Sequence, residues 1–393
     1  MDREPCICLF SALYWPSLGG VETYTANLAG ALRERGLRVI VATQSTSGPS
    51  GISEENGIEV VRLPCHPLLG GRWPFPKGGA ETRKLWTWLE EQPIDYLTVN
   101  TRFYPHSIKA LSFARRKGLA AVVVEHGSAH LTLGNAPMDT AVQLVEHALT
   151  SYGKRFHPCY YAVSRKASAW LGHFGIASCG ELSNSIDADA YRSQASERDF
   201  RKEFDMPDNA LLVAFAGRLV KEKGILQLAQ AAKAMAGDDC RPLAVVAAGA
   251  GPLEADLKTL EGSTFHLTGR LDKADMAALL IQADALCLPS RSEGFSTALL
   301  EAAACGTPAI ATDVGGVDEL IPGSSFGTVI PNAEPPTILE ALRNAAKDRS
   351  RLHAQGANAA ELVQREYSWD RTAAKTLEAC RRAQLAMQEA GKS

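Results

Sequence analysis

The hydrophobic pattern of the chain switches repeatedly between short apolar runs and longer amphipathic stretches. This alternation is typical of β-strands joined by helices and predicts doubly wound parallel sheets. The first series of predicted strands comprises residues 7–10, 38–42, 96–99, 121–125 and 160–163. The second series comprises residues 211–216, 243–248, 264–267, 285–288, 309–311 and 328–330. The pattern therefore predicts an α/β fold with two Rossmann-like halves.

A polar and charge-rich stretch between Ser183 and Pro207 separates the two series of strands. Domain boundaries fall in such stretches because few contacts cross them. A length of 393 residues also exceeds the roughly 250–300 residues at which single cores stop growing. We therefore expect an N-terminal domain over 1–186, a second domain over 187–368 and a final helix over 369–393, with a central cleft between the domains.

The segment from His66 to Trp88 does not follow the alternation. It combines aromatic and basic residues with glycines and prolines: Trp73, Phe75, Trp86, Trp88, Arg72, Lys77, Arg83 and Lys84. We expect a long loop here. Such side chains are typical of contacts with an anionic membrane, but they also occur on ordinary packed or solvated surfaces. A peripheral membrane contact through residues 66–88 is therefore one open alternative.

Composition narrows the class of protein. The 41 basic residues against 44 acidic ones give a net charge of −3, which is unlike a protein that neutralises nucleic-acid phosphates. No apolar run approaches the roughly 20 residues of a membrane span, and the start of the chain does not resemble a signal peptide. The nine cysteines form no paired pattern. We expect a cytoplasmic protein, either free or peripheral at the inner face of the membrane.

The segment from Ser290 to Gly316 follows a predicted strand, turns at a glycine and opens a helix at about Ser296 or Thr297. Free amides at a helix N-terminus form an anion site. Gly294 lets the backbone approach a ligand closely, and the two hydroxyls can cap the helix or donate to a phosphate oxygen. The segment therefore predicts a phosphate site.

Two carboxylates belong to this segment. Glu293 precedes the helix, whereas Glu301 lies about one turn inside it, so the two can address different parts of one ligand. A lone acidic residue is more often a solvated charge or a helix-dipole partner. The surrounding strand, glycine turn and helix favour a ligand site instead.

In each half, one further turn follows the first strand. Arg218 and Lys223 follow the strand 211–216, where cations can neutralise a diphosphate, because open α/β sheets bind ligands outside the carboxyl ends of their strands. Gly19 and Gly20 precede a helix in the first half at the corresponding place. A glycine pair alone is weak support, but its position matches a second ligand-binding turn.

No metal site is expected. Glu125, His126 and His130 lie at the end of a predicted strand, but their spacing is not that of a known zinc motif and no further ligand is evident. Asp187 and Asp189 form a D-x-D pair, a pattern that can hold a divalent metal on a diphosphate. Its place at the expected domain crossing favours a chance occurrence.

These motifs together resemble the retaining glycosyltransferases of family 4, which have the two-domain GT-B fold. The resemblance runs over nearly the whole chain and includes Gly19-Gly20-Val-Glu22, Gly217-Arg218, Lys223-Gly224, Gly249-Ala-Gly251-Pro, Gly306-Thr-Pro308 and Asp313-Val-Gly315-Gly316. Its most specific part is the E-x7-E motif from Glu293 to Glu301. The sequence departs from the family at Ser183-Asn184-Ser185, which affects the linker rather than catalysis.

The resemblance implies roles for individual residues. Glu293 would meet the transferred sugar and Glu301 the donor ribose, while Arg218 and Lys223 would hold the diphosphate. Backbone amides of Gly294, Phe295 and Ser296 would meet the phosphates or the sugar, and the main chain at Leu271, after Arg270, would meet the nucleobase. His126 would lie beside the donor sugar, and Gly20 near the phosphates and the acceptor. The final helix would cross back onto the N-terminal domain.

We therefore expect a metal-independent retaining hexosyltransferase without a cofactor. Its donor would be a nucleotide-diphosphate sugar, with UDP preferred over GDP, and its acceptor a hydroxyl of a glycan, a glycolipid or a small glycoside. A covalent role for Glu293 is disfavoured because no acid partner is evident. The alternatives are a nucleotide-sugar epimerase or phosphorylase of the same fold, and a non-catalytic glycan-binding protein.

Overall fold

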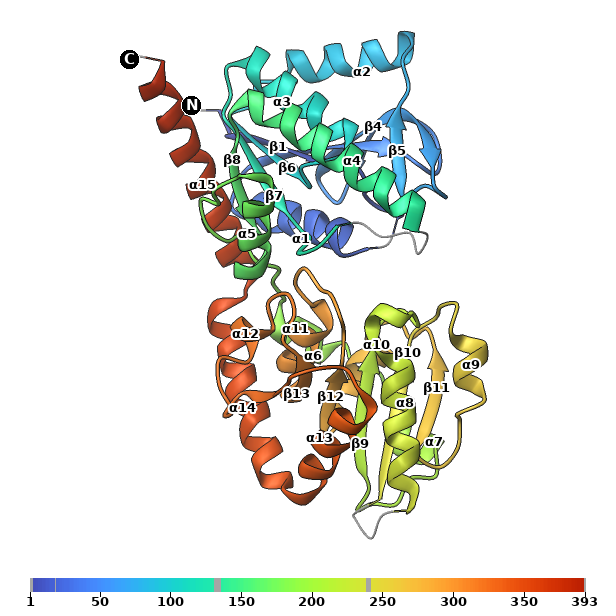
Figure 1. Ribbon diagram of the computed structural model, residues 1–393. Helices are drawn as coiled ribbons and strands as arrows, with labels where there is room; N and C mark the ends of the chain where they lie inside the picture. The colour runs from blue at the N-terminus through green and yellow to red at the C-terminus, as the bar shows by residue number, and fades with distance from the viewer. Residues whose placement is uncertain (1–2, 18, 131–135, 238–241, 392–393) are drawn as a thin grey trace. The chain divides into compact units, whose positions relative to one another are not determined.

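The computed structural model describes residues 3–17, 19–130, 136–237 and 242–391. The chain divides into two compact units, which are described separately. Unit 1 consists of residues 1–184 together with 369–393, and unit 2 consists of residues 185–368. Each unit is a helix-covered, largely parallel sheet (Figure 1). The α/β class with two parallel sheets is therefore confirmed.

Unit 1 contains a sheet with the strand order β3-β4-β2-β1-β6-β7-β8, and β5 pairs with β4. The strands are β1 (Cys6–Ser11), β2 (Arg38–Ser45), β3 (Gly51–Glu55), β4 (Ile58–Leu68), β5 (Trp73–Pro76), β6 (Tyr96–Asn100), β7 (Ala121–Glu125) and β8 (Cys159–Ala162). The central strands are parallel, whereas β3 and β5 run antiparallel to β4. Every residue of β1 and β7 is buried because helices cover both faces.

The helices of unit 1 form two layers (Figure 1). They are α1 (Gly20–Glu34), α2 (Ala80–Glu91), α3 (Pro105–Lys117), α4 (Ala136–Gly153), α5 (Arg165–Leu171) and α15 (Trp369–Ala390), with short 3-10 turns η1 (Lys154–Phe156) and η2 (Gly172–Phe174). The final helix α15 packs on α1, β6 and β7. Arg35 forms an ion pair with Asp370 at 2.7 Å, and the ring of Tyr24 meets that of Trp369 at 5.5 Å. The C-terminal helix is thus part of unit 1.

Unit 2 contains a parallel sheet with the strand order β11-β10-β9-β12-β13-β14. The strands are β9 (Leu211–Ala216), β10 (Leu243–Ala248), β11 (Phe265–Gly269), β12 (Ala285–Leu288), β13 (Ala309–Thr312) and β14 (Gly327–Ile330). The order reverses between β9 and β12, so the loops that follow these two strands diverge to opposite faces of the sheet. A crevice at such a reversal is the usual ligand site of open α/β sheets.

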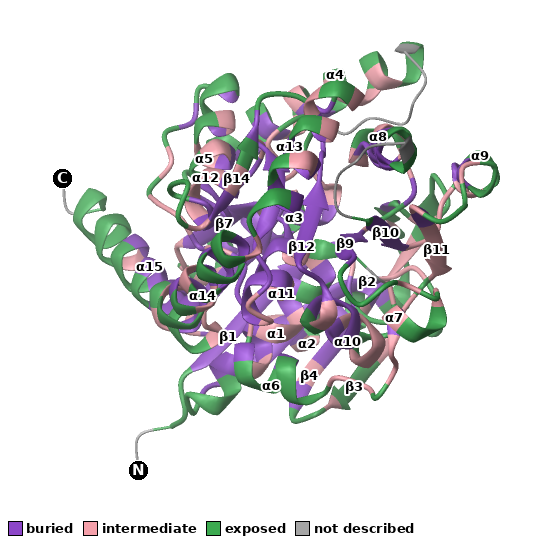
Figure 2. Ribbon diagram, turned by 90° about the horizontal axis from the view of Figure 1, so that it is seen from below, coloured by how far each residue is buried: buried purple, intermediate pink, exposed green. Residues whose placement is uncertain are grey.

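The helices of unit 2 complete its layers. They are α6 (Ala188–Ser193), α7 (Phe200–Glu203), α8 (Ile225–Ala234), α9 (Glu254–Lys258), α10 (Lys273–Gln282), α11 (Thr297–Ala304), α12 (Val317–Leu320), α13 (Pro335–Lys347) and α14 (Arg349–Glu366), with 3-10 turns η3 (Lys221–Lys223) and η4 (Met235–Gly237). Figure 2 shows the buried strands beneath helices whose outer faces are exposed. The apolar stripe of each helix therefore lies on the sheet.

The expectation of a long loop over residues 66–88 is wrong. These residues form the end of β4, the antiparallel strand β5 and most of α2. Trp73 is buried, and Trp86 stacks on Phe10 with ring centroids 6.0 Å apart. The prolines that suggested a loop are tolerated because β5 is an edge strand. Most of the aromatic surface therefore belongs to the fold of unit 1.

Candidate functional site

The loops after β9 and β12 are joined at the carboxyl edge of the unit 2 sheet. The backbone amide of Arg291 donates to the carbonyl of Glu222 at 2.7 Å. Gly224 has φ +67°, and a Cβ at this position would collide with the carbonyl oxygen of Pro289. Only glycine allows both the left-handed backbone and this close approach. The two predicted donor-binding turns thus form one surface.

Lys223 and Glu293, from these two turns, form an ion pair between Nζ and Oε1. Their side chains are only 21% and 13% exposed, respectively. The hydroxyl of Ser290 also donates to Glu293 Oε1 at 2.9 Å. The structure therefore brings together a cation predicted for the diphosphate and the carboxylate predicted for the sugar, and Ser290 adds a partner that the sequence did not single out.

Two further predicted donor residues, Arg218 and Arg270, are exposed and follow β9 and β11. Among the described residues neither guanidinium has an acidic partner. Leu271 is half-buried beside Arg270, directly after Gly269, which has φ +70°. An uncompensated guanidinium at a strand end is available to bind an anion. Arg218 therefore follows the same strand as Lys223 and, within the part of the chain that the structure describes, has no acidic partner.

The turn from Gly294 to Thr297 leads into α11, which begins at Thr297. Ser296 occupies the N-cap position, but its hydroxyl makes no capping hydrogen bond, so the expected cap by Ser296 or Thr297 is wrong. The first amides of a helix lack acceptors within the helix. Without a side-chain cap, this N-terminus remains suited to an anion.

The loop after β13 packs against the same turn. A Cβ on Gly315 would lie 2.8 Å from the carbonyl oxygens of both Glu293 and Gly294. The buried ring of Phe295 occupies the space over Gly316. Close packing of this kind fixes the backbone, because any side chain at these glycines would displace the turn.

Glu301 lies on α11 beside Tyr191 of α6, and interaction with the Tyr191 hydroxyl lowers the pKa of the carboxyl group. Burial raises the pKa of Glu301 to about 7, while the charge of Lys273 and the Tyr191 hydroxyl oppose this rise. The two residues of the E-x7-E motif therefore differ in environment. Glu293 is paired with a cation, whereas Glu301 is a half-buried carboxyl group that forms no ion pair among the described residues.

In unit 1, His126 directly follows β7 and is tied to buried polar groups. Its Nε2 lies 2.9 Å from Asn100 Oδ1, and the Asn100 amide donates to Thr25 Oγ1 at 2.9 Å. Because Asn100 uses its amino group for Thr25, its oxygen accepts from His126 and places the proton on Nε2. Burial lowers the pKa of His126 to about 3. The imidazole is therefore neutral, and Nδ1 carries a lone pair.

The glycine pair begins helix α1. Gly19 is the N-cap in extended conformation and makes no side-chain cap, and Gly20 is the first helical residue. A Cβ on Gly19 would collide with the carboxyl group of Glu22, whereas one on Gly20 would meet nothing. Burial raises the pKa of Glu22. A side chain at position 19 would thus have to displace the Glu22 carboxyl group, whereas Gly20 leaves the helix N-terminus open.

The D-x-D residues have local structural partners. Asp187 caps α6 by accepting from the amide of Ala190 at 3.0 Å, and Asp189 pairs with Arg192 at 2.7 Å. Glu125 forms an ion pair with the buried Arg102. These contacts account for the acidic residues that the sequence had raised as possible metal ligands.

The sequence missed Ser290, Tyr191 and Asn100 as site residues. Ser290 lies within the predicted donor segment, and Asn100 is the polar residue that directly follows a predicted strand, so both carried a weak signal. Tyr191 is distant in sequence from Glu301 and carried none. Only the packing of α6 on α11 brings it to the carboxyl group.

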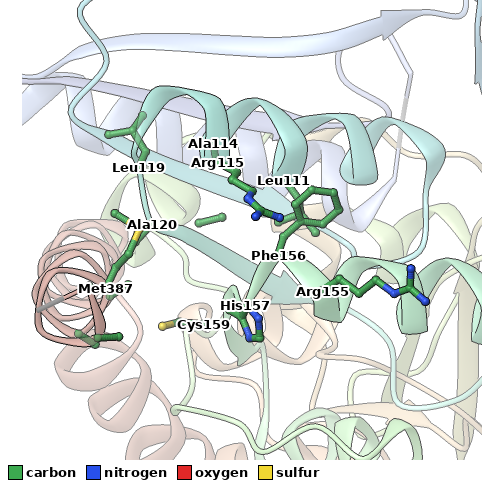
Figure 3. Close-up of a pocket in the computed structure, with 15 residues that line it drawn as sticks. Leu111, Ala114, Arg115, Leu119, Ala120, Arg155, Phe156, His157, Cys159 and Met387 are labelled. Atoms are coloured by element: carbon green, nitrogen blue, oxygen red, sulfur yellow. The ribbon is translucent and has the colours of Figure 1, made fainter. Parts of the chain in front are cut away.

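A separate cavity of about 480 Å³ lies in unit 1 between α3, β8 and α15 (Figure 3). Its lining includes Leu111, Phe156, Met387 and the two cations Arg115 and Arg155. It adjoins the first residues of β7 and β8, which is the edge opposite His126. No predicted donor residue lines this cavity. It is therefore distinct from the predicted site.

Two family models match the chain. The model described as Glycosyltransferase Family 4 matches residues 18–189, and the model described as Glycosyl transferases group 1 matches residues 196–362. The chain belongs to the family 4 glycosyltransferases. Between them the matched ranges contain Gly19, Gly20 and His126 of unit 1 and the E-x7-E segment of unit 2.

Relatives and solved structures match this glycosyltransferase over most of their length. The D-inositol 3-phosphate glycosyltransferase 2 of Catenulispora acidiphila is 25% identical over 391 residues, which cover 91% of this chain and 88% of the relative. Sucrose-phosphate synthase from Thermosynechococcus elongatus has a TM-score of 0.73 at 20% identity, covering 98% of this chain and all of that one. HepE from Anabaena in complex with UDP-glucose has a TM-score of 0.68 at 19% identity, covering 95% and 99%. These structures share the fold, so the predicted GT-B architecture is confirmed.

Among the helices that the structure describes, none has the length and apolar character needed to cross a bilayer.

Proposed function

We propose that this glycosyltransferase is a retaining hexosyltransferase whose unit 2 binds a nucleotide-diphosphate sugar, with UDP preferred over GDP. The observation that carries the proposal is the part-buried Lys223–Glu293 pair at the carboxyl edge of the sheet, on the same turn as the uncompensated Arg218. A binding site for a neutral glycan alone would not need this cation arrangement. The fold of HepE with UDP-glucose supports the choice of donor class.

The proposed reaction requires charge stabilisation rather than a metal. The bond between the anomeric carbon and the phosphate oxygen breaks, and the departing diphosphate gains negative charge. Arg218, Lys223 and the uncapped N-terminus of α11 can stabilise that charge in a fixed arrangement. The acceptor hydroxyl bonds to the anomeric carbon on the same face, and its proton passes to the departing phosphate oxygen.

Lys223 would exchange partners during this cycle. In the free protein it compensates Glu293, which also accepts from Ser290. A bound diphosphate would draw Lys223 toward the phosphates and leave Glu293 to accept hydrogen bonds from sugar hydroxyls. The donor itself would thereby prepare Glu293 for the sugar, while Arg270 and the backbone at Leu271 would lie by the nucleobase.

His126 would act as a neutral hydrogen-bond acceptor for the donor sugar. Its proton lies on Nε2, toward Asn100, and its Nδ1 is the atom left for a hydroxyl. An imidazole whose pKa is lowered to about 3 by burial does not supply positive charge near neutral pH. The cations of unit 2 must therefore stabilise the leaving group.

The acceptor would be a hydroxyl of a glycan, a glycolipid or a small glycoside. A phosphorylated inositol is the first acceptor to test, because the Catenulispora relative is named for inositol 3-phosphate. A lipid-linked acceptor would also fit the apolar hairpin tip of unit 1, where Leu68, Leu69 and Phe75 are 49%, 42% and 49% exposed. Arg72 and Lys77 flank this tip and are exposed.

The deciding experiment screens nucleotide sugars without and with acceptors, and follows donor loss and product stereochemistry by NMR. Slow donor hydrolysis without acceptor and an axial-to-axial or equatorial-to-equatorial product would support a retaining transferase. Epimerised donor would favour the epimerase, and no binding of any nucleotide sugar would favour a glycan-binding protein. Equal rates with and without added Mg²⁺ or Mn²⁺ are expected for transfer that needs no metal on the diphosphate.

The membrane contact has its own test. Co-sedimentation with vesicles containing anionic lipid should be lost in the double variant Leu68→Ser with Phe75→Ser. Ile281→Ser, which removes a comparably exposed side chain from α10, is the matched control. Sedimentation that is absent at low salt in the unmodified protein would rule out this contact.

A further inference from the structure

Three histidines that are far apart in sequence converge in unit 1. His130 follows β7, His147 lies on α4 and His173 lies in η2, and each offers a ring nitrogen within 4.8 Å of the others. The ring centroids of each pair are 5.2–5.5 Å apart. His130 and His147 are half-buried and His173 is exposed, so solvent reaches the group from one side. Neutral imidazoles at this separation can share one transition-metal ion.

The orientation of His130 is fixed from behind. Its Nδ1 lies 2.8 Å from Oε2 of the buried Glu146. An Nδ1–H that donates to a carboxylate leaves the lone pair on Nε2, and the carboxylate makes that nitrogen more basic. This carboxylate–histidine arrangement is the usual support of a metal-binding imidazole. His173 is held in a similar way by its parallel stacking on Trp170, with centroids 4.7 Å apart.

The charges behind the histidines also favour a cation. Arg102 forms ion pairs with both Glu125 and Glu146, and all three side chains are 1% exposed. One guanidinium against two carboxylates leaves one buried negative charge, and buried charges are costly unless compensated. A metal ion on the histidines would be linked to Glu146 through His130 and would compensate this charge.

We propose that His130, His147 and His173 form a binding site for one divalent transition-metal ion, with zinc as the first choice. The fourth position would hold water, because the site provides three protein nitrogens and His173 is exposed. The site lies outside the predicted donor residues and does not hold the diphosphate. Its role is to position the segment from His126 to His130.

The connection to that segment is continuous. Glu146 contacts Arg102, Arg102 contacts Glu125, and Glu125 Oε1 accepts from the backbone amides of His126 at 3.1 Å and Gly127 at 2.9 Å. Metal binding would fasten one end of the segment at His130. Glu125 already holds the other end. The ion would therefore restrict the backbone that carries His126 without touching a substrate.

The experiment titrates Zn²⁺ into the full-length protein after removal of metal by chelator, using calorimetry. We expect one ion per chain, and a loss of affinity of at least about 100-fold in His147→Ala and in His173→Ala, since even indirect supports of a metal commonly contribute 10–100-fold. His353→Ala, which changes an exposed histidine of α14, is the matched control and should bind as the unmodified protein does. Co²⁺ in place of Zn²⁺ should give the visible absorption of a tetrahedral site.

A second readout separates binding at this site from binding elsewhere. Zn²⁺ should slow hydrogen exchange in peptides that contain residues 126–130, and His173→Ala should abolish this effect. His173 is exposed, so this variant should fold. Absence of Zn²⁺ binding, or binding that survives both histidine variants, would overturn the proposal. Neither result bears on whether the chain binds a nucleotide sugar.

Discussion

Replacing Glu301 tests whether a residue of the candidate site lowers the free energy of unfolding. A pKa of about 7 in place of the ordinary 4.5 corresponds to about 3 kcal/mol, at about 1.4 kcal/mol per pKa unit. The folded protein binds this proton more tightly than the unfolded chain does. The associated stability is therefore present below pH 4.5 and is lost as the pH rises through 7.

Glu301→Gln removes this loss because glutamine stays neutral and can still accept from Tyr191. At pH 8 we expect the variant to be more stable than the unmodified protein by up to about 3 kcal/mol, whereas at pH 4.5 the two should be nearly equal. Urea unfolding followed at both pH values measures the difference. Glu340→Gln, an exposed glutamate on α13, is the matched control. A Glu301→Gln variant that is no more stable at pH 8 would refute the argument.

The same substitution should weaken binding of the donor. A ribose diol donates hydrogen bonds, so it binds the ionised carboxylate better than the protonated acid or the amide. Donor affinity of the unmodified protein should rise roughly tenfold between pH 6 and pH 8, because about one tenth of Glu301 is ionised one pH unit below its pKa. Calorimetric titration with a UDP-sugar checks this. Glu301→Gln should bind weakly at both pH values, and an unchanged pH dependence in it would remove Glu301 from the donor site.

Three further predictions concern other single residues. Arg218→Ala should raise the donor KM and lower kcat by about 100-fold through loss of charge stabilisation; near-normal steady-state kinetics, compared with the exposed neighbour Lys221→Ala, would reject the diphosphate role. His126→Phe should lower kcat/KM for the donor, and the pH profile of the unmodified protein between pH 5 and 8 should contain no step from this imidazole, because burial holds the pKa of His126 at about 3. Gly224→Ala should destabilise the protein, because alanine in a left-handed conformation costs about 1–2 kcal/mol and its Cβ would also displace Pro289. Thermal unfolding measures the loss. Gly306→Ala is the control, because Gly306 has φ +74° but open space around its Cβ position.

The periodicity of the sequence predicted the strands of unit 2 and β1, β2, β6, β7 and β8 of unit 1, because most of these are continuous apolar runs. The edge of unit 1 was not predicted. β3 and β5 include polar and proline residues, and each pairs antiparallel with β4. β4 pairs parallel with β2, but Glu59, Arg62 and Pro64 interrupt its apolar run. The sequence pattern of residues 66–88 is consequently typical of a loop. An edge strand tolerates prolines, which elsewhere indicate that a segment is not a strand.

Much of the candidate site was also accessible from the sequence, since strand-end glycines and charges occur at fixed places in a parallel sheet. The pairing of Lys223 with Glu293 joins two turns that are 70 residues apart, and neither turn reveals which cation meets which carboxylate. The histidine cluster was not predicted for a stronger reason. His130, His147 and His173 follow no spacing motif, because three separate elements bring them together.

The buried polar groups of unit 1 are best explained by function. Ser11, Asn100 and Glu125 end three adjacent strands, and each is at most 1% exposed. A buried ion pair such as Arg102 with Glu125 is often no more stabilising than apolar residues of the same volume, so sheet stability alone does not call for this set. The same strands begin with ordinary apolar residues. What the polar end achieves is orientation: Asn100 selects the Nε2–H form of His126, and Glu125 holds the amides beside it. Unit 1 therefore has an oriented hydrogen-bond acceptor in place at its carboxyl edge before any ligand arrives.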